Sequence, residues 1–390
     1  MEERYMNILD DLYAEKEMTT NAIQSFEDAI ADQQQCFAAL SGAGRKLMGY
    51  FCTYTPVEIL HASGFIPVRI HAGTGRMDKA GQHLPDFICA YMKLSLENAL
   101  DGKYDFLAGL VQGYSCDAAC GLVNIWKDIF KERFFHTVPL PYKDTPEARA
   151  YYRSALLELT EKLNSAGGHF SETRLKDSID LYARIRRCQL ELDERRRKGS
   201  AAVSSTHLMA IVDAGFYLPP ELYLSMLEDF PDRLPPDPPA AKSGFPVIIS
   251  GSLIEDGKIL DAVESSGGRI VADDLCNGFR QTFPAEGIGE NPLDRLIDRY
   301  VNRFPCPART NAEDRGRRLL AMAGDTGAKA MVFVVQKFCT PHLADYPRLS
   351  EMLKDNGIAS ILVEMDETWQ MSSQMKTRLE SFFEMMGSAA

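Results

Sequence analysis

The sequence predicts an α/β protein in which two Rossmann-like lobes, each with a parallel sheet, flank a central cleft. Three observations support this fold class. Apolar, β-branched runs alternate with helical patterns, as in parallel sheets covered on both faces. The alternation occurs twice, once on each side of a proline-rich stretch. A length of 390 residues also exceeds one ordinary domain, at roughly 150 residues per domain.

The chain divides into four predicted segments. Near the N-terminus, Ile8, Leu9, Leu12 and Tyr13 share one helix face, and the sequence FPDRLPPDPPAAKSGFP at 230–246 is the clearest linker. In order, we expect an N-terminal helical segment, a first α/β lobe, a helical segment with the linker, and a second α/β lobe ending in a helix. These segments span residues 1–45, 46–144, 145–245 and 246–390.

Each predicted lobe is a series of strands separated by helices. In the first lobe, buried strands are expected at 45–51, 65–70 and 105–113, helices at 56–64, 91–102 and 118–130, and 133–141 closes the series. In the second lobe, strands are expected at 246–253, 268–275, 328–338 and 358–366, and an amphipathic helix at 372–387 ends the chain.

Composition excludes several classes of function. With 55 acidic against 43 basic residues, the net charge of −12 disfavours nucleic acid as the main partner. No apolar run reaches the roughly 18 residues of a membrane span, so we expect no membrane association. The acidic, amphipathic N-terminus resembles neither a signal peptide nor a transit peptide, and a cytoplasmic location is therefore expected.

The nine cysteines are the unusual feature of the composition. Four of them follow predicted strands: Cys52, Cys116, Cys276 and Cys339. Ligands bind outside the carboxyl ends of strands in open parallel sheets, and a following helix N-terminus favours a thiolate there. These positions therefore suit ligands to a metal or a cluster.

Two further cysteines, Cys89 and Cys306, lie in loops beside predicted helices. Three of the six cysteines thus precede the linker and three follow it at comparable spacings, as expected for two similar lobes that face one cleft. Widely spaced thiolates can ligate iron–sulfur clusters because the fold supplies the geometry. The chain has no C-x-x-C pair, which disfavours zinc ribbons and thioredoxin chemistry. From spacing alone, core packing of these thiols remains the alternative.

The remaining cysteines are expected to be core thiols. Cys36 and Cys188 lie in helical patterns. Cys120 falls four residues after Cys116, on the same helix face, so a role as ligand stays open beside packing.

Several segments together carry a family signature. They are GYFCTYTPVEILHASGFIPVRI, FICAYMK, GYSCDAACGLVNIW, DDLCNGFRQTF, YVNRFPCP and VVQKFCTPHLADYPRLSEML. Taken in this order, they resemble the 2-hydroxyacyl-CoA dehydratase/benzoyl-CoA reductase family from about residue 46 to the C-terminus. The resemblance implies α/β lobes that sandwich an iron–sulfur cluster, and an ATP-hydrolysing iron–sulfur activator protein that supplies low-potential electrons.

The cysteine pattern bears on the branch of this family. For the dehydratase members, the resemblance implies one [4Fe-4S] cluster on three cysteines, which correspond to Cys89, Cys116 and Cys339. The additional Cys52, Cys276 and Cys306 resemble the double-cubane branch, where an [8Fe-9S] cluster lies within each subunit, usually of a homodimer. That branch resembles reductases of small molecules and puts a CoA-thioester substrate in doubt.

Candidate proton donors follow Cys52. Glu58 and His61 lie three residues apart, hence on one helix face, and reduction consumes protons as well as electrons. The alternative is that Glu58 stabilises its helix N-terminus and that His61 is a partly buried packing residue.

Three functional hypotheses remain from the sequence. The first is an activator-dependent iron–sulfur reductase with a double-cubane cluster. The second is a 2-hydroxyacyl-CoA dehydratase or benzoyl-CoA reductase subunit with one [4Fe-4S] cluster and an acyl-CoA substrate, with a heterodimer possible. The third is a non-catalytic electron-storage protein. The lack of a G-x-x-x-x-G-K-[ST] loop agrees with ATP hydrolysis in a separate partner.

Overall fold

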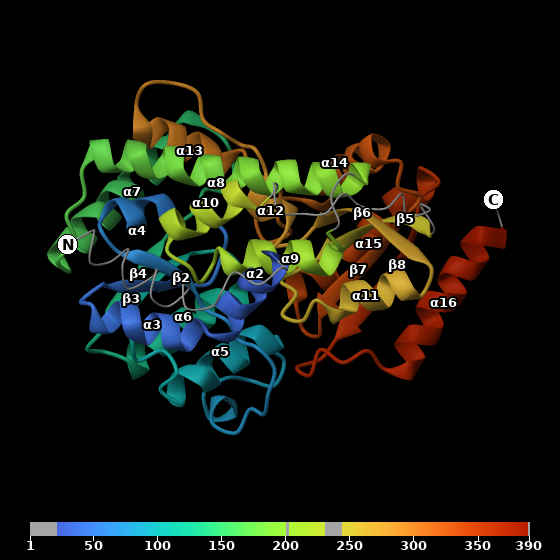
Figure 1. Cartoon of the computed structure of the whole chain (residues 1–390), viewed down its shortest axis with the longest axis horizontal. Helices are drawn as coiled ribbons and strands as arrows, with labels where there is room; N and C mark the ends of the chain where they lie inside the picture. Colours follow the sequence, from blue (N-terminus) through green and yellow to red (C-terminus); the bar gives the residue numbers. More distant parts are fainter. Residues whose placement is uncertain (1–21, 200–202, 231–243, 389–390) are drawn as a thin grey trace.

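The computed structural model describes residues 22–199, 203–230 and 244–388. It contains two four-stranded parallel sheets covered by helices, which confirms the predicted α/β class with two Rossmann-like lobes (Figure 1). The helix face expected around residues 8–13 and most of the proline-rich stretch lie outside the described residues.

The first sheet has the strand order β2-β1-β3-β4, and every neighbouring pair is parallel. Its strands are β1 (Leu47–Tyr50), β2 (Ile66–Arg69), β3 (Leu107–Gly113) and β4 (Phe134–Val138). The connections carry α4 (Val57–Ala62), the 3₁₀ turn η1 (Ala80–Gln82), α5 (Ala90–Leu100) and α6 (Asp117–Ile129).

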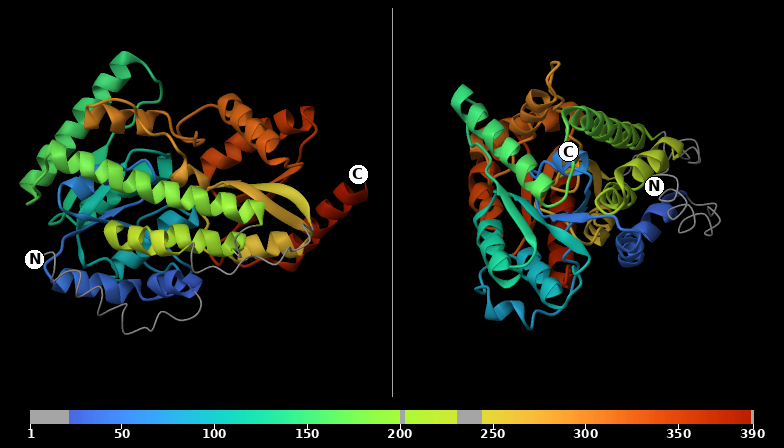
Figure 2. Two further views of the ribbon diagram at one scale, coloured as in Figure 1. Left: turned by 45° about the horizontal axis from the view of Figure 1, so that its top comes forward. Right: turned by 90° about the vertical axis from the view of Figure 1, so that its left-hand side faces the viewer.

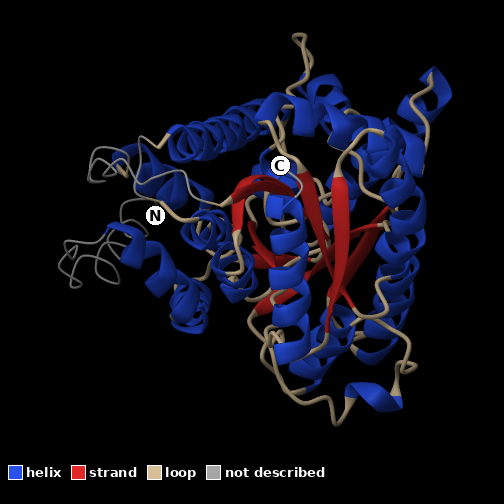
Figure 3. Cartoon of the chain, turned by 90° about the vertical axis from the view of Figure 1, so that its right-hand side faces the viewer, coloured by secondary structure: helices blue, strands red, loops and turns tan. Residues whose placement is uncertain are grey.

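The second sheet repeats this topology as β6-β5-β7-β8, again all parallel. Its strands are β5 (Phe245–Gly251), β6 (Gly268–Asp274), β7 (Ala330–Gln336) and β8 (Ala359–Met365). Its helices are α11 (Lys258–Ser265), α12 (Phe279–Thr282), α13 (Pro292–Val301), α14 (Ala312–Thr326), α15 (Thr340–Asp355) and α16 (Ser373–Ser388). Figure 3 shows strands enclosed between helices, which explains why β7 is buried along its whole length.

The other helices precede the first sheet or connect the two sheets. They are α2 (Ala22–Ala31), α3 (Gln33–Gly42), α7 (Pro146–Ser165), α8 (Glu172–Lys198), α9 (Ser205–Ala214) and α10 (Pro220–Asp229). The long α8 runs along both lobes (Figure 2). It packs on α4, α10 and α13, and its Arg196 donates to the Ile270 carbonyl of β6. Within the described ranges, no helix combines the length and apolar character needed to cross a membrane.

The sheets reach their close packing through glycines. In β5, a Cβ on Gly251 would overlap the backbone carbonyl of Val334 on neighbouring β7. A backbone group in a central strand cannot turn aside as a flexible side chain can, so this position admits no side chain without a shift of the sheet. Since β5 and β7 carry the loops around the candidate site, this close approach also fixes the site.

Replacing Gly251 by alanine is therefore expected to destabilise the fold by about 1–3 kcal/mol, because the added methyl group forces the two strands apart. Gly324→Ala is the matched control: Gly324 lies in α14, and a Cβ added there would have open space around it. For this control we expect the free energy of unfolding to rise by about 0.5–1 kcal/mol, because alanine has a higher helix propensity than glycine. Denaturant unfolding measures both changes, and equal effects at the two positions would contradict the argument.

Candidate metal centre

The six candidate cysteines lie in loops at sheet edges and helix ends. Cys52 follows β1, Cys116 follows β3, and Cys339 follows β7, so each lies beyond the carboxyl end of its strand. Cys276 likewise follows β6 of the second sheet. Cys89 and Cys306 lie outside the strands: Cys89 immediately precedes α5, and Cys306 lies between α13 and α14.

Three of these residues occupy the same place on a helix. Cys89, Cys116 and Cys339 are the N-cap residues of α5, α6 and α15, and none of their side chains makes a capping hydrogen bond. The helix after Cys339 begins at Thr340, earlier than the sequence pattern indicates, with Pro341 in its first turn. Each sulfur is thus next to the positive end of a helix dipole.

The symmetry between the lobes is partial. Cys116 and Cys339 follow the equivalent strands β3 and β7, and Cys89 and Cys306 both lie in the connection before those strands. Cys52, however, follows β1, whereas Cys276 follows β6, the counterpart of β2. Two of the three pairs therefore match in topology, and the third pair does not.

Burial shifts the pKa of four of these thiols. It raises the pKa of Cys306 to about 12 and raises the pKa values of Cys89, Cys116 and Cys339 as well. Backbone amides in the adjoining turns oppose this effect without overcoming it. Thiolates in such surroundings need a cationic partner, because an uncompensated charge is costly away from water.

The same thiols act on one another across the two lobes. Besides burial, charges at Cys89, Cys52 and Cys306 raise the pKa of Cys116. Charges at Cys89, Cys116 and Cys276 raise that of Cys339, and charges at Cys276 and Cys52 raise that of Cys306. Cys276 and Cys339 of the second lobe also pack against the apolar core that includes Cys89. These effects link thiols of the first lobe with thiols of the second.

A single metal ion is not the group that these residues suit. Among the described residues, no set of three or more His, Cys, Asp or Glu side chains lies close enough to hold one ion. A multi-iron cluster attaches each thiolate to a different iron, so its ligands stand farther apart than those of one ion. Six thiols from two lobes, one of them buried and five partly buried, fit that second kind of donor set.

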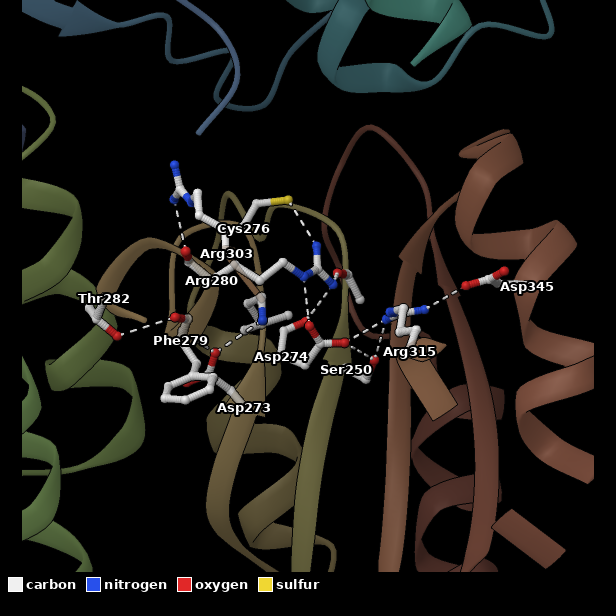
Figure 4. A network of polar contacts seen from close by, with 12 residues as sticks. Ser250, Asp273, Asp274, Cys276, Phe279, Arg280, Thr282, Arg303, Arg315 and Asp345 are labelled. Carbon is white, nitrogen blue, oxygen red and sulfur yellow. Dashed lines mark hydrogen bonds and ion pairs between the residues drawn. The ribbon is translucent and has the colours of Figure 1, made fainter. Parts of the chain in front are cut away.

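A buried arginine touches one of these sulfurs. Arg280, only 2% exposed, donates from Nη1 to the Cys276 Sγ at 3.2 Å and from Nε to Asp274 at 2.6 Å. Its Nη2 donates to the carbonyls of Gly251 and Asp274, which fixes the plane of the guanidinium (Figure 4). The Cys276 sulfur therefore receives a charge-assisted contact from a side chain that has no freedom to leave.

The carboxylate that holds Arg280 is itself held by a second arginine. Arg315 donates to Asp274 Oδ2 at 2.5 Å and to Ser250 Oγ at 2.8 Å, and it lies 3.3 Å from Asp345. Burial alone would raise the pKa of Asp274, but Arg280 and Arg315 outweigh it and hold that pKa below its usual value. Asp274 stays ionised and links β5, β6 and α14 beneath the Cys276 loop.

A third arginine joins the loops of the two lobes. Arg303 donates to the carbonyls of Thr53, next to Cys52, and of Arg280. Its guanidinium lies over the rings of Tyr54 and Tyr300, 5.3 and 5.4 Å from their centroids. Sequence reasoning did not single out Arg280, Arg303 or Arg315, although the first two lie inside the segments that carry the family signature.

The two predicted proton donors face different surroundings. Glu58, 1% exposed, accepts from the Tyr300 hydroxyl at 2.8 Å and from Arg186 at 3.3 Å. His61 instead contacts Ser178 at 3.0 Å and Glu221 at 2.8 Å, on the side of α8 and α10. The structure thus brings Glu58 toward the Arg303–Tyr300 group and leaves His61 among the covering helices. The roles predicted for them stay predictions.

A small pocket lies between the lobes beside Asn277, the residue after Cys276. Its walls include Arg69, His71, Asp213 and Glu255. His71 and Glu255 form an ion pair at 2.7 Å. Burial raises the pKa of Asp213 to about 7, although a hydrogen bond from Asn277 opposes the shift.

The other three cysteines have different neighbours. Cys36 is buried in α3. Burial and the charge of Glu228 raise the pKa of Cys188 on α8. The Cys120 thiol interacts with the Tyr114 hydroxyl. These contacts suit the packing role expected for Cys36 and Cys188, and they leave the question of Cys120 as a ligand open.

Comparison with known proteins gives a consistent result. Residues 52–386 match the family model described as 2-hydroxyglutaryl-CoA dehydratase, D-component. The chain is 26% identical to the (R)-phenyllactyl-CoA dehydratase beta subunit of Clostridium sporogenes, over 92% of this chain and 97% of the relative. It is 28% identical to the lactoyl-CoA dehydratase subunit beta of Anaerotignum propionicum (88% and 92%). It is 26% identical to a benzoyl-CoA reductase subunit of Thauera aromatica (85% and 88%).

Removing Arg315 tests the buried ion group. Arg315→Met is expected to destabilise the fold by about 3–5 kcal/mol, because Asp274 keeps its charge with only one of its two arginines. Arg317→Met on the same helix removes an exposed pair with Asp314 and should cost less than about 0.5 kcal/mol. Denaturant unfolding of both variants gives the comparison, and a similar small loss for both would refute the assigned importance of Asp274.

Replacing Asp213 tests the second buried acid. Its folded-state pKa of about 7 exceeds the ordinary 3.8. Between those pH values the unfolded chain loses the proton that the folded chain keeps, so the wild type loses stability as pH rises. Asp213→Asn should therefore match the wild type near pH 4 and become the more stable protein by pH 7, with a constant gap above. Thermal unfolding across this range measures the gap. A gap independent of pH would mean that burial does not raise this pKa.

Proposed function

Because the chain belongs to the 2-hydroxyacyl-CoA dehydratase/benzoyl-CoA reductase family, we propose that it is an iron–sulfur reductase. It receives low-potential electrons from an ATP-hydrolysing iron–sulfur activator and reduces a small molecule at a double-cubane [8Fe-9S] cluster. The ligands are Cys52, Cys89, Cys116, Cys276, Cys306 and Cys339.

One observation carries this proposal. The six thiols come from both lobes and lie against two shared cores, Cys89, Cys116, Cys276 and Cys339 at one and Cys52 and Cys306 at the other. A donor set for one cubane would leave Cys52, Cys276 and Cys306 as partly buried thiols without a function. Arg280 already directs a positive charge at one of these three.

The protein residues have separate roles in this proposal. A bound cluster of this kind supplies stored electrons one at a time. Arg280 orients the Cys276 sulfur and, through its hydrogen bond, raises the tendency of that ligand group to accept an electron. Arg69 adds a second buried positive charge, since the Cys276 and Cys52 thiols are among the groups that act on it.

Glu58 is the better placed of the two proposed proton donors. Its carboxylate meets the Tyr300 hydroxyl, and Tyr300 lines an open cavity beside Tyr54. A proton can therefore pass between Glu58 and the cavity through one hydroxyl group. For His61 the contacts to Ser178 and Glu221 suggest proton exchange only with the outer helices.

The surroundings of the site also suit a protein partner. Phe87, Tyr114 and Phe338 are exposed aromatic residues, 67, 44 and 40% accessible, and each lies within two residues of a proposed ligand. Such exposed rings are typical of surfaces that a second protein covers. We assign these exposed rings to the binding of the activator, and we propose a homodimer. We also place the protein in the cytoplasm, because all nine cysteines are free thiols.

A second candidate function has its own support. The relatives are dehydratase beta subunits and a benzoyl-CoA reductase subunit, and only Cys89, Cys116 and Cys339 occupy helix N-caps. A chain with one [4Fe-4S] cluster on these three thiols, in a heterodimer with an acyl-CoA substrate, would use that arrangement. The iron content distinguishes the two candidates.

Anaerobically purified protein is expected to contain about eight irons and about nine acid-labile sulfides per chain. Replacing Cys276 by serine should remove roughly half of the iron or more, because serine is a poor ligand for these clusters. Cys188→Ser is the control and should leave the iron content unchanged, since that thiol lies among other neighbours.

A content of about four irons in the wild type, undiminished by Cys276→Ser and lost in Cys116→Ser, would exclude the double-cubane version and favour the second candidate. Iron analysis and electron paramagnetic resonance of the reduced protein provide the two independent readouts.

A further inference from the structure

A cavity of about 160 Å³ opens beside Tyr54, the residue two positions after Cys52. Its wall combines three parts of the chain: the loop after β4, the helix α7, and the segment from the end of α13 to α14. Tyr142, 58% exposed, lies where the cavity opens to the surface. The cavity is separate from the small one between the lobes that contains Asp213.

Positive charges predominate in this cavity. Arg303 and Arg309 lie in its wall, with Lys143 and Arg318 more exposed. Its two acids have arginine partners of their own: Asp144 pairs with Arg149 at 2.5 Å, and Asp314 pairs with Arg317 at 3.2 Å. A ligand entering the cavity therefore meets an excess of cationic hydrogen-bond donors.

A second, independent feature is an unused hydroxyl group. Tyr152 on α7 is fully buried and lines the cavity, and its hydroxyl has no hydrogen-bond partner among the described residues. Burial raises the pKa of this phenol, so it is neutral and can donate a hydrogen. A buried hydroxyl without a partner is unusual, and an acceptor oxygen of a ligand that reached it would satisfy it.

The cavity is adjacent to the cysteine group. Pro305, next to Cys306, lines it, and so does Tyr54, two residues after Cys52. Tyr300, which binds Glu58, forms another part of the wall. A molecule held here would have thiols on one side and a proton source on another.

We propose that this cavity binds the oxyanion group of the substrate, a carboxylate or a phosphate, between the Tyr152 hydroxyl and the guanidinium groups of Arg303 and Arg309. The tyrosine and both arginines line one cavity, and its two acids are already paired with other arginines, which together favour an anion over a neutral or cationic molecule. That the bound molecule is a substrate rests on the proposed function; that the cavity binds an anion does not.

The two sources of such an anion are a free small carboxylate and the phosphate groups of a coenzyme A thioester. Calorimetric titration of the anaerobically purified full-length protein with propionate, propionamide and coenzyme A separates them. We expect binding of propionate or of coenzyme A that weakens with added salt, and at least tenfold weaker binding of propionamide. Binding of propionate identifies a small acid, and binding of coenzyme A alone identifies the thioester.

Variants locate the binding in the cavity. Tyr152→Phe and Arg309→Gln should each weaken binding of the preferred anion at least tenfold, whereas Arg378→Gln, an exposed arginine on α16, should leave it unchanged. Without ligand, Tyr152→Phe should unfold at the same temperature as the wild type or a higher one, because it removes an unpaired buried hydroxyl.

Measurable and equal binding of propionamide and propionate, no binding of propionate or coenzyme A, or full affinity in Tyr152→Phe would overturn the proposal. The iron and sulfide content of the same preparations is measured separately. An anion site in a protein with the wrong iron content would leave this inference standing and remove the proposed function instead.

Discussion

The buried carboxylate of Asp274 is the constraint on which the site depends. It ends β6 directly before the Cys276 loop, and it binds Arg280 on one oxygen and Arg315 on the other. Neither arginine could remain inside the protein without it, because an unpaired guanidinium in such surroundings is costly. Through these two contacts the position of a proposed ligand is coupled to β5, to α14 and to the core of the second lobe.

From Asp274 the polar contacts continue into the first lobe. The backbone carbonyl of Arg280 accepts a hydrogen bond from Arg303. Arg303 also donates to a backbone carbonyl in the loop that carries Cys52. The two lobes therefore meet through hydrogen-bonded arginines, in addition to apolar packing and α8. These contacts join the loops of both lobes that carry proposed ligands.

The candidate site could be anticipated only in part. Strand ends could be recognised from their apolar runs, so the loops with Cys52, Cys116, Cys276 and Cys339 could be placed at sheet edges. The arginines could not, because an arginine in an amphipathic helix such as α14 ordinarily faces water. Nor could the orientation of His61, since the partner that turns it outward, Glu221, is remote in the chain and is brought near only by folding.

The sequence by itself determined the secondary structure, the two parallel sheets and the family, because these depend on periodicity and on short motifs along the chain. Tertiary structure alone decided which side chains meet: that the thiols of both lobes act on one another, that Glu58 binds Tyr300, and that the Tyr152 hydroxyl has no partner among the described residues. Contacts of this kind join residues far apart in the chain, and their free energy depends on burial, which no local pattern records.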